Sequence, residues 1–346
     1  MLALPCEDQA EEGEDKDGEL WFDGNCAAAL ETVELAAAGE EEEGAGGGSQ
    51  PLMQLKVTAL MSARLCESVS RRLREGGSEL TAARLEALMG GEAASFPFLS
   101  PAQNRHLTLS LQRLDRVASS AVARGVGVLV DAEGTEVNPA LSLATAALAG
   151  RHNRHGAWVW NTYQAYLRDG PGRLQEEAEL AARRGLCFGA KLVRGAYLER
   201  ERLRAEQSGA PDPLQPDRAA TDRSYHQCLD TVLPLVARRP QRFRLMVATH
   251  NEASVLYAAR RMEELGIERG GGAVSFGQLL GMCDHVSLAL GSAGYAVYKS
   301  VPWGPAGAVL PYLARRAREN RRLLRDGARE RRLLAGELRR RLTPWA

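Results

Sequence analysis

The segment from residue 298 to residue 320, YKSVPWGPAGAVLPYLARRAREN, carries two adjacent arginines shortly after a tyrosine. On a helix, Tyr312 lies three residues before Arg315 and four before Arg316, so the three side chains can reach one edge. Glu319 follows one turn later. Two guanidinium groups at one edge can bind a carboxylate bidentately and keep their charge. A solvated basic helix with an Arg315–Glu319 pair is the alternative that these residues alone leave open.

Two lysines in apolar runs offer a second kind of chemistry. Lys56 lies in QLKVTAL and Lys191 in CFGAKLVRGAY. Such a lysine can form a Schiff base with a carbonyl substrate, stabilise an anion or a cofactor, or pair with a carboxylate such as Asp131. The spacing leaves all three open.

Other common kinds of site have little support in the sequence. The six histidines and six cysteines show no metal-ligand spacing, so no metal site is predicted. No usable phosphate-binding glycine motif and no local nucleophile motif is present. A hydrolase is therefore disfavoured.

Seven short apolar runs predict the strands that would position these residues. They are continuous rather than alternating, which is typical of parallel strands buried on both faces. Helical periods lie between them, for example over 173–184 and 253–265, so the pattern predicts repeated βα units. The runs are QLKVTAL, GVGVLVDAE, AWVWNTYQ, CFGAKLVRGAY, RLMVATHNE, AVSFGQLLG and YAVYKSVPWG.

Polar residues follow the apolar part of every run. In a parallel α/β fold the carboxyl ends of the strands share one rim, where active sites lie. We therefore expect one site built from these ends. Its candidates are Lys56, Asp131, Glu133, Asn161, Gln164, Lys191, Arg194, His250, Asn251, Gln278 and Ser300.

Charged residues are distributed unevenly along the 346 residues, although the formal net charge is zero. Residues 1–50 carry fifteen Asp or Glu and one Lys, which predicts an acidic, partly disordered segment. Residues 51–346 are predicted to form the catalytic domain, with a helical insertion at about 67–123.

Residues 311–346 carry twelve Arg and four acids. This basic end can hold anions, contact an anionic membrane surface, or form a solvated helix face. Six scattered cysteines without a signal peptide fit a reduced compartment.

Several long segments, taken in order, resemble the proline dehydrogenase family, whose members are flavoenzymes that oxidise cyclic imino acids. The resemblance covers roughly residues 120–342, with a weaker match at LKVTALMSARL. The segments are KLVRGAYLERER, DPLQPDRAATDRSYHQCLD, LMVATHNEASV, RRMEELGI, FGQLLGMCDHVSLALGSAGYAVYKSVPWGP and VLPYLARRAREN.

The resemblance implies a distorted (βα)8 TIM barrel with FAD bound non-covalently at the carboxyl ends of the strands. The last helix of that barrel lies across its mouth. By this resemblance, Arg315 and Arg316 hold the carboxylate of the imino acid, Tyr312 lies beside them, and Lys56 assists. Asp131 then matches a strand-end carboxylate near the substrate ring.

Further site residues follow from the same resemblance. Leu279 matches an apolar wall of the pocket, and Lys191 matches a basic residue that faces the N5 region of the flavin. The positions that match flavin contacts are Asn161, Val193, Gly195, Tyr197, Thr249, His250, Asn251, Gln278, Arg316 and Glu319.

Ser300 is the residue that bears on the substrate. The family usually has a tyrosine there, which closes over the part of the substrate where a 4-hydroxyl would project. Serine leaves room and supplies a small donor and acceptor. The resemblance thus points to the branch that oxidises trans-4-hydroxy-L-proline, and L-proline more weakly. A proline dehydrogenase proper, an inactive truncated relative, and a Schiff-base lyase using Lys56 or Lys191 are the alternatives.

The N-terminus departs from the family pattern. About 18 residues precede ELWFDGNCAAALETVELAAAG, where the family has helices and a first strand. We therefore expect the first strand to be missing or truncated: either the chain is a shortened isoform or gene-model product, or residues 1–10 replace that strand poorly. An open barrel would expose two sheet edges.

The resemblance also implies partners and a location. Eukaryotic relatives work at the matrix side of the mitochondrial inner membrane and pass electrons to a quinone. The acidic N-terminus shows no transit segment. We expect an imino acid substrate, a quinone acceptor and peripheral membrane contact, and no nucleic acid.

Overall fold

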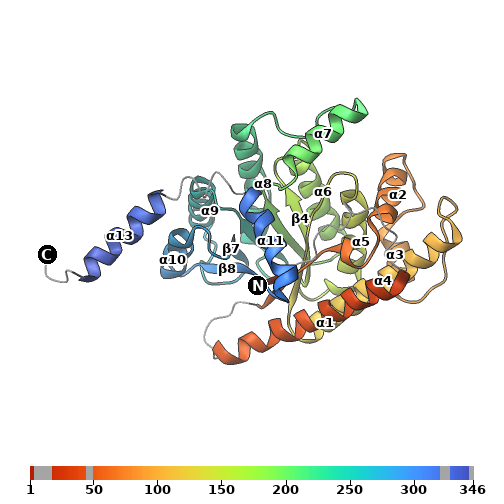
Figure 1. Cartoon of the computed structure of the whole chain (residues 1–346), viewed down its shortest axis with the longest axis horizontal. Coiled ribbons are helices and arrows are strands. Elements are labelled where there is room, and N and C mark those ends of the chain that lie inside the picture. The colour runs from red at the N-terminus through yellow and green to blue at the C-terminus, as the bar shows by residue number, and fades with distance from the viewer. Residues whose placement is uncertain (4–17, 44–49, 320–327, 343–346) are drawn as a thin grey trace.

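In the computed structural model, eight parallel strands close into a barrel that is surrounded by helices (Figure 1). The structure describes residues 1–3, 18–43, 50–319 and 328–342. The prediction of a (βα)8 TIM barrel is confirmed, because each strand pairs in parallel with its two neighbours. The strands are β1 (Leu2–Ala3), β2 (Leu52–Leu55), β3 (Gly127–Val130), β4 (Val159–Gln164), β5 (Phe188–Val193), β6 (Phe243–Ala248), β7 (Val274–Leu279) and β8 (Ala296–Pro302).

The seam between the first and last strands is closed, so the expectation of an open barrel is wrong. Leu2 pairs with Val301 of β8 and also with Met53 of β2. Two backbone bonds seal the β8 side: the Val301 amide donates to the Met1 carbonyl at 3.1 Å, and the Trp303 amide donates to the Ala3 carbonyl at 3.2 Å. The first strand is truncated to two residues, yet it closes the ring because both residues pair in register with β2 on one side and β8 on the other.

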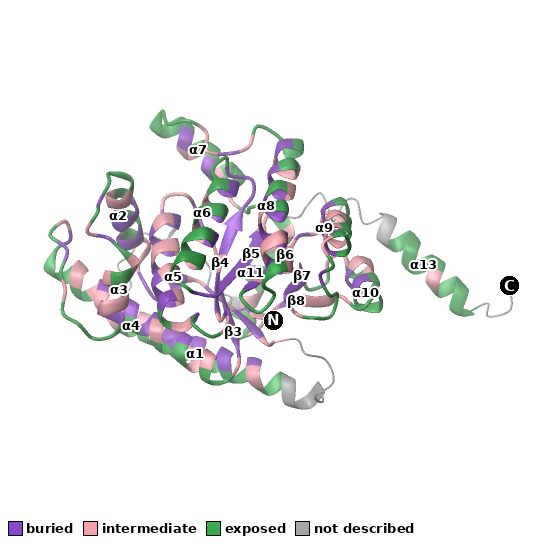
Figure 2. Cartoon of the chain, turned by 180° about the vertical axis from the view of Figure 1, so that it is seen from behind, coloured by how far each residue is buried: buried purple, intermediate pink, exposed green. Residues whose placement is uncertain are grey.

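Successive side chains of a strand point alternately into the barrel and outward to the helices. Leu52, Leu129, Trp160 and Met246 form one buried layer within the barrel. The intervening residues point outward and pack against the helices in two larger cores (Figure 2). Parity within a strand therefore decides whether a polar side chain can reach the barrel interior.

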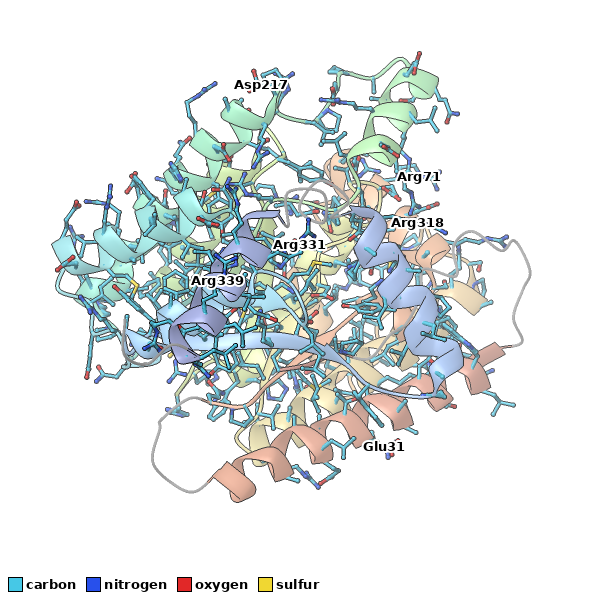
Figure 3. The ribbon with its side chains drawn as sticks, turned by 60° about the vertical axis from the view of Figure 1, so that its left-hand side comes forward. Glu31, Arg71, Asp217, Arg318, Arg331 and Arg339 are labelled. Atoms are coloured by element: carbon cyan, nitrogen blue, oxygen red, sulfur yellow. The ribbon has the colours of Figure 1, made fainter. Side chains whose placement is uncertain are left out.

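The helices lie outside the strands. Those before β5 are α1 (Gly18–Glu43), the short 3-10 helix η2 (Val57–Ala59), α2 (Ala63–Arg74), α3 (Ala82–Met89), α4 (Pro101–Ala123), α5 (Asn138–His152) and α6 (Gly170–Arg183). Those after β5 are α7 (Leu198–Ser208), α8 (Arg218–Arg238), α9 (Glu252–Glu264), α10 (Asp284–Ser292), α11 (Ala306–Glu319) and α13 (Ala328–Leu342). Charged residues such as Glu31, Arg71 and Asp217 lie on the outer surface, and Figure 3 labels them.

Helices α2, α3 and α4 occupy the stretch where a helical insertion is expected. The acidic, partly disordered segment expected over residues 1–50 falls partly outside the described residues, at 4–17 and 44–49. Between those gaps α1 lies along α4, and it buries Ala29 and Val33 (Figure 1). The boundary at residue 50 stays a prediction.

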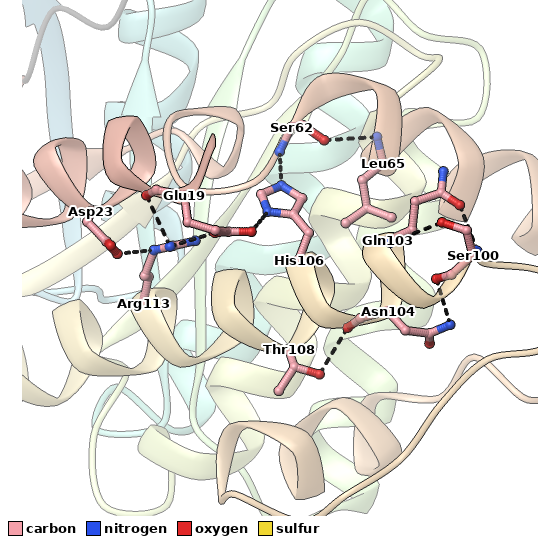
Figure 4. A network of polar contacts seen from close by, with 10 residues as sticks. All are labelled: Glu19, Asp23, Ser62, Leu65, Ser100, Gln103, Asn104, His106, Thr108 and Arg113. Carbon is pink, nitrogen blue, oxygen red and sulfur yellow. Dashed lines mark hydrogen bonds and ion pairs between the residues drawn. The ribbon is translucent and has the colours of Figure 1, made fainter. Parts of the chain in front are cut away.

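A polar network fixes the N-terminal end of α1 to α4 (Figure 4). Arg113 of α4 donates to Asp23 at 2.8 Å and pairs with Glu19 at 2.6 Å. His106 lies 2.9 Å from Glu19 through Nδ1, and its Nε2 accepts the amide of Ser62 at 3.0 Å. Because Nε2 accepts, Nδ1 carries the proton. The network thereby joins α1 to the residue that caps α2.

Candidate active site

An ion pair between a buried lysine and a partly buried aspartate lies at the carboxyl ends of β3 and β5. Lys191 Nζ lies 2.5 Å from Asp131 Oδ1, and Lys191 is only 8% exposed. The Asp131 amide donates to the carbonyl of Leu55 at 2.9 Å, which fixes the carboxylate beside β2. Of the three roles left open for Lys191, the structure therefore shows the ion pair. An ammonium held by a carboxylate is a positioned cation rather than a free amine.

Ser300 forms the second cluster, on the interior side of β8. Its Oγ accepts a hydrogen bond from Gln54 Nε2 at 2.9 Å, and Ser300 is 4% exposed. Ser300 is also hydrogen bonded to the side chain of Tyr312 on α11. Gln54 occupies one acceptor site of Oγ, which leaves the serine proton and a second lone pair for the bond with the tyrosine. The three side chains form a relay from β2 through β8 to α11.

Tyr312 connects this relay to the ion pair. Burial raises the pKa of Tyr312 above its ordinary value; Arg316 opposes this rise, and the charge of Asp131 adds to it. Lys56, just after β2, also acts on Tyr312 through its charge. Tyr312 therefore lies over the carboxyl ends of the strands. This confirms the prediction that the helix after the last strand crosses the barrel mouth (Figure 1).

The two arginines of α11 converge on one edge of the helix, as the spacing predicts. Arg316 Nη2 lies 2.5 Å from Glu319 Oε1, and Arg315 Nε lies 4.0 Å from the same oxygen. The Arg316 guanidinium stacks 5.2 Å above the centre of the Tyr312 ring. Both side chains are partly buried. The Arg315–Glu319 pair exists at the limit of an ion pair, so it holds Arg315 weakly.

The turns after β5 and β6 form the neighbouring rim. Arg194 donates to Thr249 Oγ1 at 3.2 Å and pairs with Asp222 of α8 at 2.5 Å. His250 Nε2 accepts the amide of Leu279 at 3.1 Å, which joins the β6 turn to the end of β7. Asn251 caps α9 by accepting the amide of Ser254. Val193, Gly195 and Tyr197 follow along the β5 turn.

Gly195 is a position where glycine is required. Its φ is +131°, and a Cβ there would overlap the ring of Tyr166. The glycine thus lets the chain turn sharply over the tyrosine while its backbone stays exposed.

The side chain of Asn161 points away from this set, whereas Gln278 lies at its edge, with Nε2 3.5 Å from the carbonyl oxygen of Thr249; the flavin contacts expected of both stay a prediction. Asn161 Nδ2 donates to Glu177 Oε2 at 2.9 Å and to Ser142 Oγ at 3.2 Å, toward α6 and α5. Gln278 accepts from Ser287 of α10. Both residues have the outward parity of their strands. On β4 it is Thr162 that pairs in register with Lys191.

Gln54 was not among the candidates from the sequence, whereas Gln164 and Glu133 were, and the structure shows their partners. Gln164 Nε2 donates to the Glu133 carbonyl at 2.9 Å, and Glu133 Oε1 accepts from Thr58 at 2.7 Å. Alternation could have found Gln54, since Leu52, Gln54 and Lys56 share one parity.

The donors at the mouth suit the group that the family resemblance implies. A reduced flavin ring gains negative charge, and FAD also carries a diphosphate, so the site needs cations and polar donors. Lys191 supplies a buried ammonium, Arg316 a guanidinium and Thr249 a hydroxyl. These residues fit a flavin.

A cavity of about 340 Å³ lies elsewhere, at the amino ends of the strands. Arg244 donates to Gln50 at 2.8 Å in its wall, and Trp158 lines it. No residue of the predicted site lines this cavity, and we place no chemistry there.

Known proteins match this chain over most of its length. A family model described as "Proline dehydrogenase" matches residues 13–326. "Hydroxyproline dehydrogenase" of Xenopus laevis is 51% identical over 344 residues, which cover 99% of this chain and 72% of that protein. The Homo sapiens protein of the same description is 52% identical over 350 residues, with 99% and 75% covered. "Proline dehydrogenase 1, mitochondrial" of Homo sapiens is 50% identical over 236 residues, 68% of this chain and 39% of that protein.

Solved structures with the same fold are proline utilization A proteins. The Bdellovibrio bacteriovorus structure has a TM-score of 0.66 and 22% identity, and a Bradyrhizobium japonicum variant has 0.67 and 23%. Each covers 92% of this chain, which spans only 29% and 28% of those proteins. At this identity the likeness bears on the fold alone.

Proposed function

This chain belongs to the proline dehydrogenase family, and on that premise we propose that it is an FAD-dependent dehydrogenase that prefers trans-4-hydroxy-L-proline to L-proline. Oxidation of proline or hydroxyproline is the activity that the family and the named relatives support. The observation that carries the finer proposal is the buried Ser300 hydroxyl, held by Gln54 beneath Tyr312.

The residues at the mouth have separate roles in this proposal. Arg315 and Arg316 bind the substrate carboxylate, because their guanidiniums lie at one helix edge and keep their charge. The substrate would lose a hydride from C5, the ring carbon beside the nitrogen that does not carry the carboxylate, and the N–H proton to solvent, which gives the corresponding Δ1-pyrroline-5-carboxylate; FAD, when bound, would supply the two-electron acceptor for the hydride. Lys191 would hold the flavin side of the site, with Asp131 fixing its ammonium.

Ser300 then contacts the 4-hydroxyl. The serine leaves open the space that a tyrosine ring would fill, and its hydroxyl can accept or donate. A pocket that only tolerates a hydroxyl discriminates weakly, whereas one that hydrogen bonds to it rejects the analogue that lacks it. The preference for hydroxyproline over proline therefore depends both on the space beside Ser300 and on the hydrogen bond from Ser300 to the 4-hydroxyl.

The acceptor and location are further parts of the proposal. A mitochondrial location is supported by the relative named "Proline dehydrogenase 1, mitochondrial". We place the enzyme at the matrix side of the inner membrane with a quinone as electron acceptor, by family resemblance. Among the described residues, no helix is long and apolar enough to cross a membrane.

Proline dehydrogenase proper is the second candidate function. It is favoured by the 50% identity over 236 residues to the human protein of that description. The two candidates share a reaction and differ in the environment of the 4-position, so one substitution can separate them.

The test compares the parent with Ser300→Tyr and Ser300→Ala. The tyrosine fills the space, and the alanine keeps the space but removes the hydroxyl. We expect Ser300→Tyr to shift the ratio of kcat/KM values toward proline by at least about tenfold. Ser300→Ala should shift it less. Steady-state kinetics with both substrates, beside the flavin absorbance of each purified protein, provide the measurement.

A parent that prefers proline, or a ratio unchanged in Ser300→Tyr, would make the chain a proline dehydrogenase proper. A purified parent without flavin absorbance that gains none on added FAD would contradict the flavoenzyme itself.

A further inference from the structure

The turn between β7 and α10 follows directly on Leu279, the last residue of β7. Leu279 pairs in register with Ser300 of β8. A Cβ at Gly277, two residues earlier, would overlap Met246 in the buried layer within the barrel, so Gly277 and Leu279 face the barrel interior. By family resemblance, Leu279 is an apolar wall of the substrate pocket. The position of this turn therefore decides where that wall lies.

The backbone of the turn is strained. Residues 280–283 connect β7 to α10, and Gly281 and Cys283 have φ values of +73° and +53°. In the part of the chain that the structure describes, Cys283 is the one residue other than glycine with a positive φ. Such a conformation costs free energy and persists only where other contacts fix it. The turn therefore needs contacts that hold it in place.

Lys299 of β8 supplies such contacts. Its Nζ lies 2.7 Å from the carbonyl oxygen of Met282, 3.5 Å from that of Leu279 and 2.6 Å from Oδ1 of Asp284. Lys299 has the outward parity of β8, so its long side chain could extend into water. It bends instead onto three oxygens at one turn, and only 22% of the side chain is exposed. The three donors of an ammonium match these three acceptors.

Leu279 is held from its other neighbour as well. Its amide donates to His250 Nε2 in the turn after β6 at 3.1 Å, and its carbonyl oxygen accepts from the Met282 amide at 3.2 Å. Figure 1 shows β7, β8 and α10 next to one another, and β6 pairs with β7 on the other side. Contacts from β8 and from the turn after β6 therefore both fix the backbone of Leu279.

We propose that Lys299 is a positioning residue for substrate binding: its ammonium holds the turn after β7 and thereby fixes Leu279 beside the substrate ring. The role rests on the proposed function, since that function places an imino acid ring against Leu279. Lys299 acts through Leu279, because its own side chain leaves the outer face of β8. The Asp284 carboxylate is 51% exposed, so its ion pair with Lys299 contributes little and the carbonyl contacts carry the effect.

Lys299→Met tests the proposal, because methionine keeps an unbranched side chain and lacks the ammonium. We expect KM to rise about five- to tenfold for both trans-4-hydroxy-L-proline and L-proline, with kcat within about twofold, since an apolar wall binds ground state and transition state alike. The ratio of the two kcat/KM values should stay within about twofold, unlike in Ser300→Tyr. Lys299→Gln keeps a neutral donor and should raise KM by a smaller factor.

Two further measurements separate positioning from a general loss of stability. In a Leu279→Ala background, which lacks the wall, Lys299→Met should raise KM by less than about twofold more. Hydrogen exchange with mass spectrometry should show faster exchange of residues 280–283 in Lys299→Met and unchanged exchange in β3 and β4. Leu280→Ser is the matched control, because Leu280 lies in the same turn with its side chain 52% exposed. It should keep the parent's KM values.

The outcomes distinguish this role from the proposed function. An active parent whose KM values are unchanged in Lys299→Met would overturn the role of Lys299 and leave the proposed function in place. A parent that oxidises neither imino acid would contradict the proposed function, and the role of Lys299 with it. Equal increases of KM in the parent and in Leu279→Ala would mean that Lys299 does not act through Leu279. An equal increase in Leu280→Ser would show that any change in the turn has the same effect, which would also overturn the proposal.

Discussion

Gln54 holds the Ser300 hydroxyl in place. Its amide donates to the serine and occupies one acceptor site of Oγ, which leaves the hydroxyl proton and one lone pair for Tyr312 or a substrate oxygen. Without that amide the hydroxyl can rotate. Gln54 is thus a positioning residue for the selectivity that we propose for Ser300.

Gln54→Leu should therefore lower the preference for hydroxyproline about three- to tenfold, the cost of one fixed hydrogen bond. The measurement is the ratio of kcat/KM values for the two substrates. In a Ser300→Ala background, the same change should have little further effect, because the bond is already gone. If Gln54→Leu changed the kcat/KM ratio equally in the parent and in Ser300→Ala, Gln54 would not act through Ser300.

The arginine pair on α11 offers a second test at the same scale. Arg315→Met or Arg316→Met removes a charge-assisted contact with the carboxylate, worth about 2–4 kcal/mol. We expect kcat/KM to fall about 30- to 1000-fold, while the melting temperature changes little.

Arg318→Met is the matched control for these variants, because Arg318 lies exposed on the same helix. It should keep the parent's kinetics. Values within threefold of the parent for both Arg315 and Arg316 variants would remove them from carboxylate binding.

The sequence located much of this site but not all of it. Lys56, Asp131, Lys191 and Ser300 could be predicted because polar residues at parallel strand ends gather at one rim. The direction of the Asn161 side chain, toward α5 and α6, could not be predicted, because a strand end known to within one residue does not fix the side on which a side chain points. The contact between Tyr312 and Ser300 depends on how α11 crosses the mouth, which no local pattern encodes.

At the scale of elements, the acidic helix α1 is held by charge as well as by packing. Burial disfavours the Glu19 carboxylate, but Arg113 and His106 outweigh it, so the pKa of Glu19 lies below its ordinary value of 4.5. The folded protein therefore prefers the ionised form more strongly than the unfolded chain does. This contribution is fully present above pH 4.5 and is lost as the pH falls through the lower, folded value.

Glu19→Gln should accordingly destabilise the protein at pH 7 and make its stability less dependent on pH below 4.5. Urea midpoints of parent and variant at pH 7 and pH 4 measure this. Glu31, exposed on the same helix, gives the control Glu31→Gln, which should follow the parent at both pH values. Parallel pH profiles for parent and Glu19→Gln would contradict the role of the network.

Some strands could be predicted from the sequence more readily than others. Seven strands were predicted because each is a continuous apolar run. For β1 the sequence offered only the alternative that residues 1–10 replace the first strand poorly, since MLALP is shorter than a typical strand and carries no alternation. Pairing on both sides compensates for its length, and that pairing is a tertiary property.

At the scale of the whole molecule, the short β1 decides whether the ring is closed. Ala3 is 3% exposed, so Ala3→Asp would place a charge in the seam. We expect it to destabilise the protein by about 2–4 kcal/mol and to speed amide exchange of Val301 and Trp303. Hydrogen exchange with mass spectrometry measures both strands at the seam.

Ala27→Asp is the control for that change, because Ala27 is exposed on α1. Its stability and exchange should match the parent. Unchanged protection of Val301 in Ala3→Asp would mean that β1 does not hold the seam.

The pairing of Leu2 with Val301 also bears on how the chain folds during its synthesis. These partners are about three hundred positions apart, so this contact has one of the largest sequence separations in the molecule and a correspondingly high entropic cost of loop closure. On the ribosome, β2 to β7 can emerge and pair one after another while the N-terminal residues wait. The barrel can be completed only after β8 has left the exit tunnel, and until then both sheet edges are open to a chaperone or to a neighbouring nascent chain.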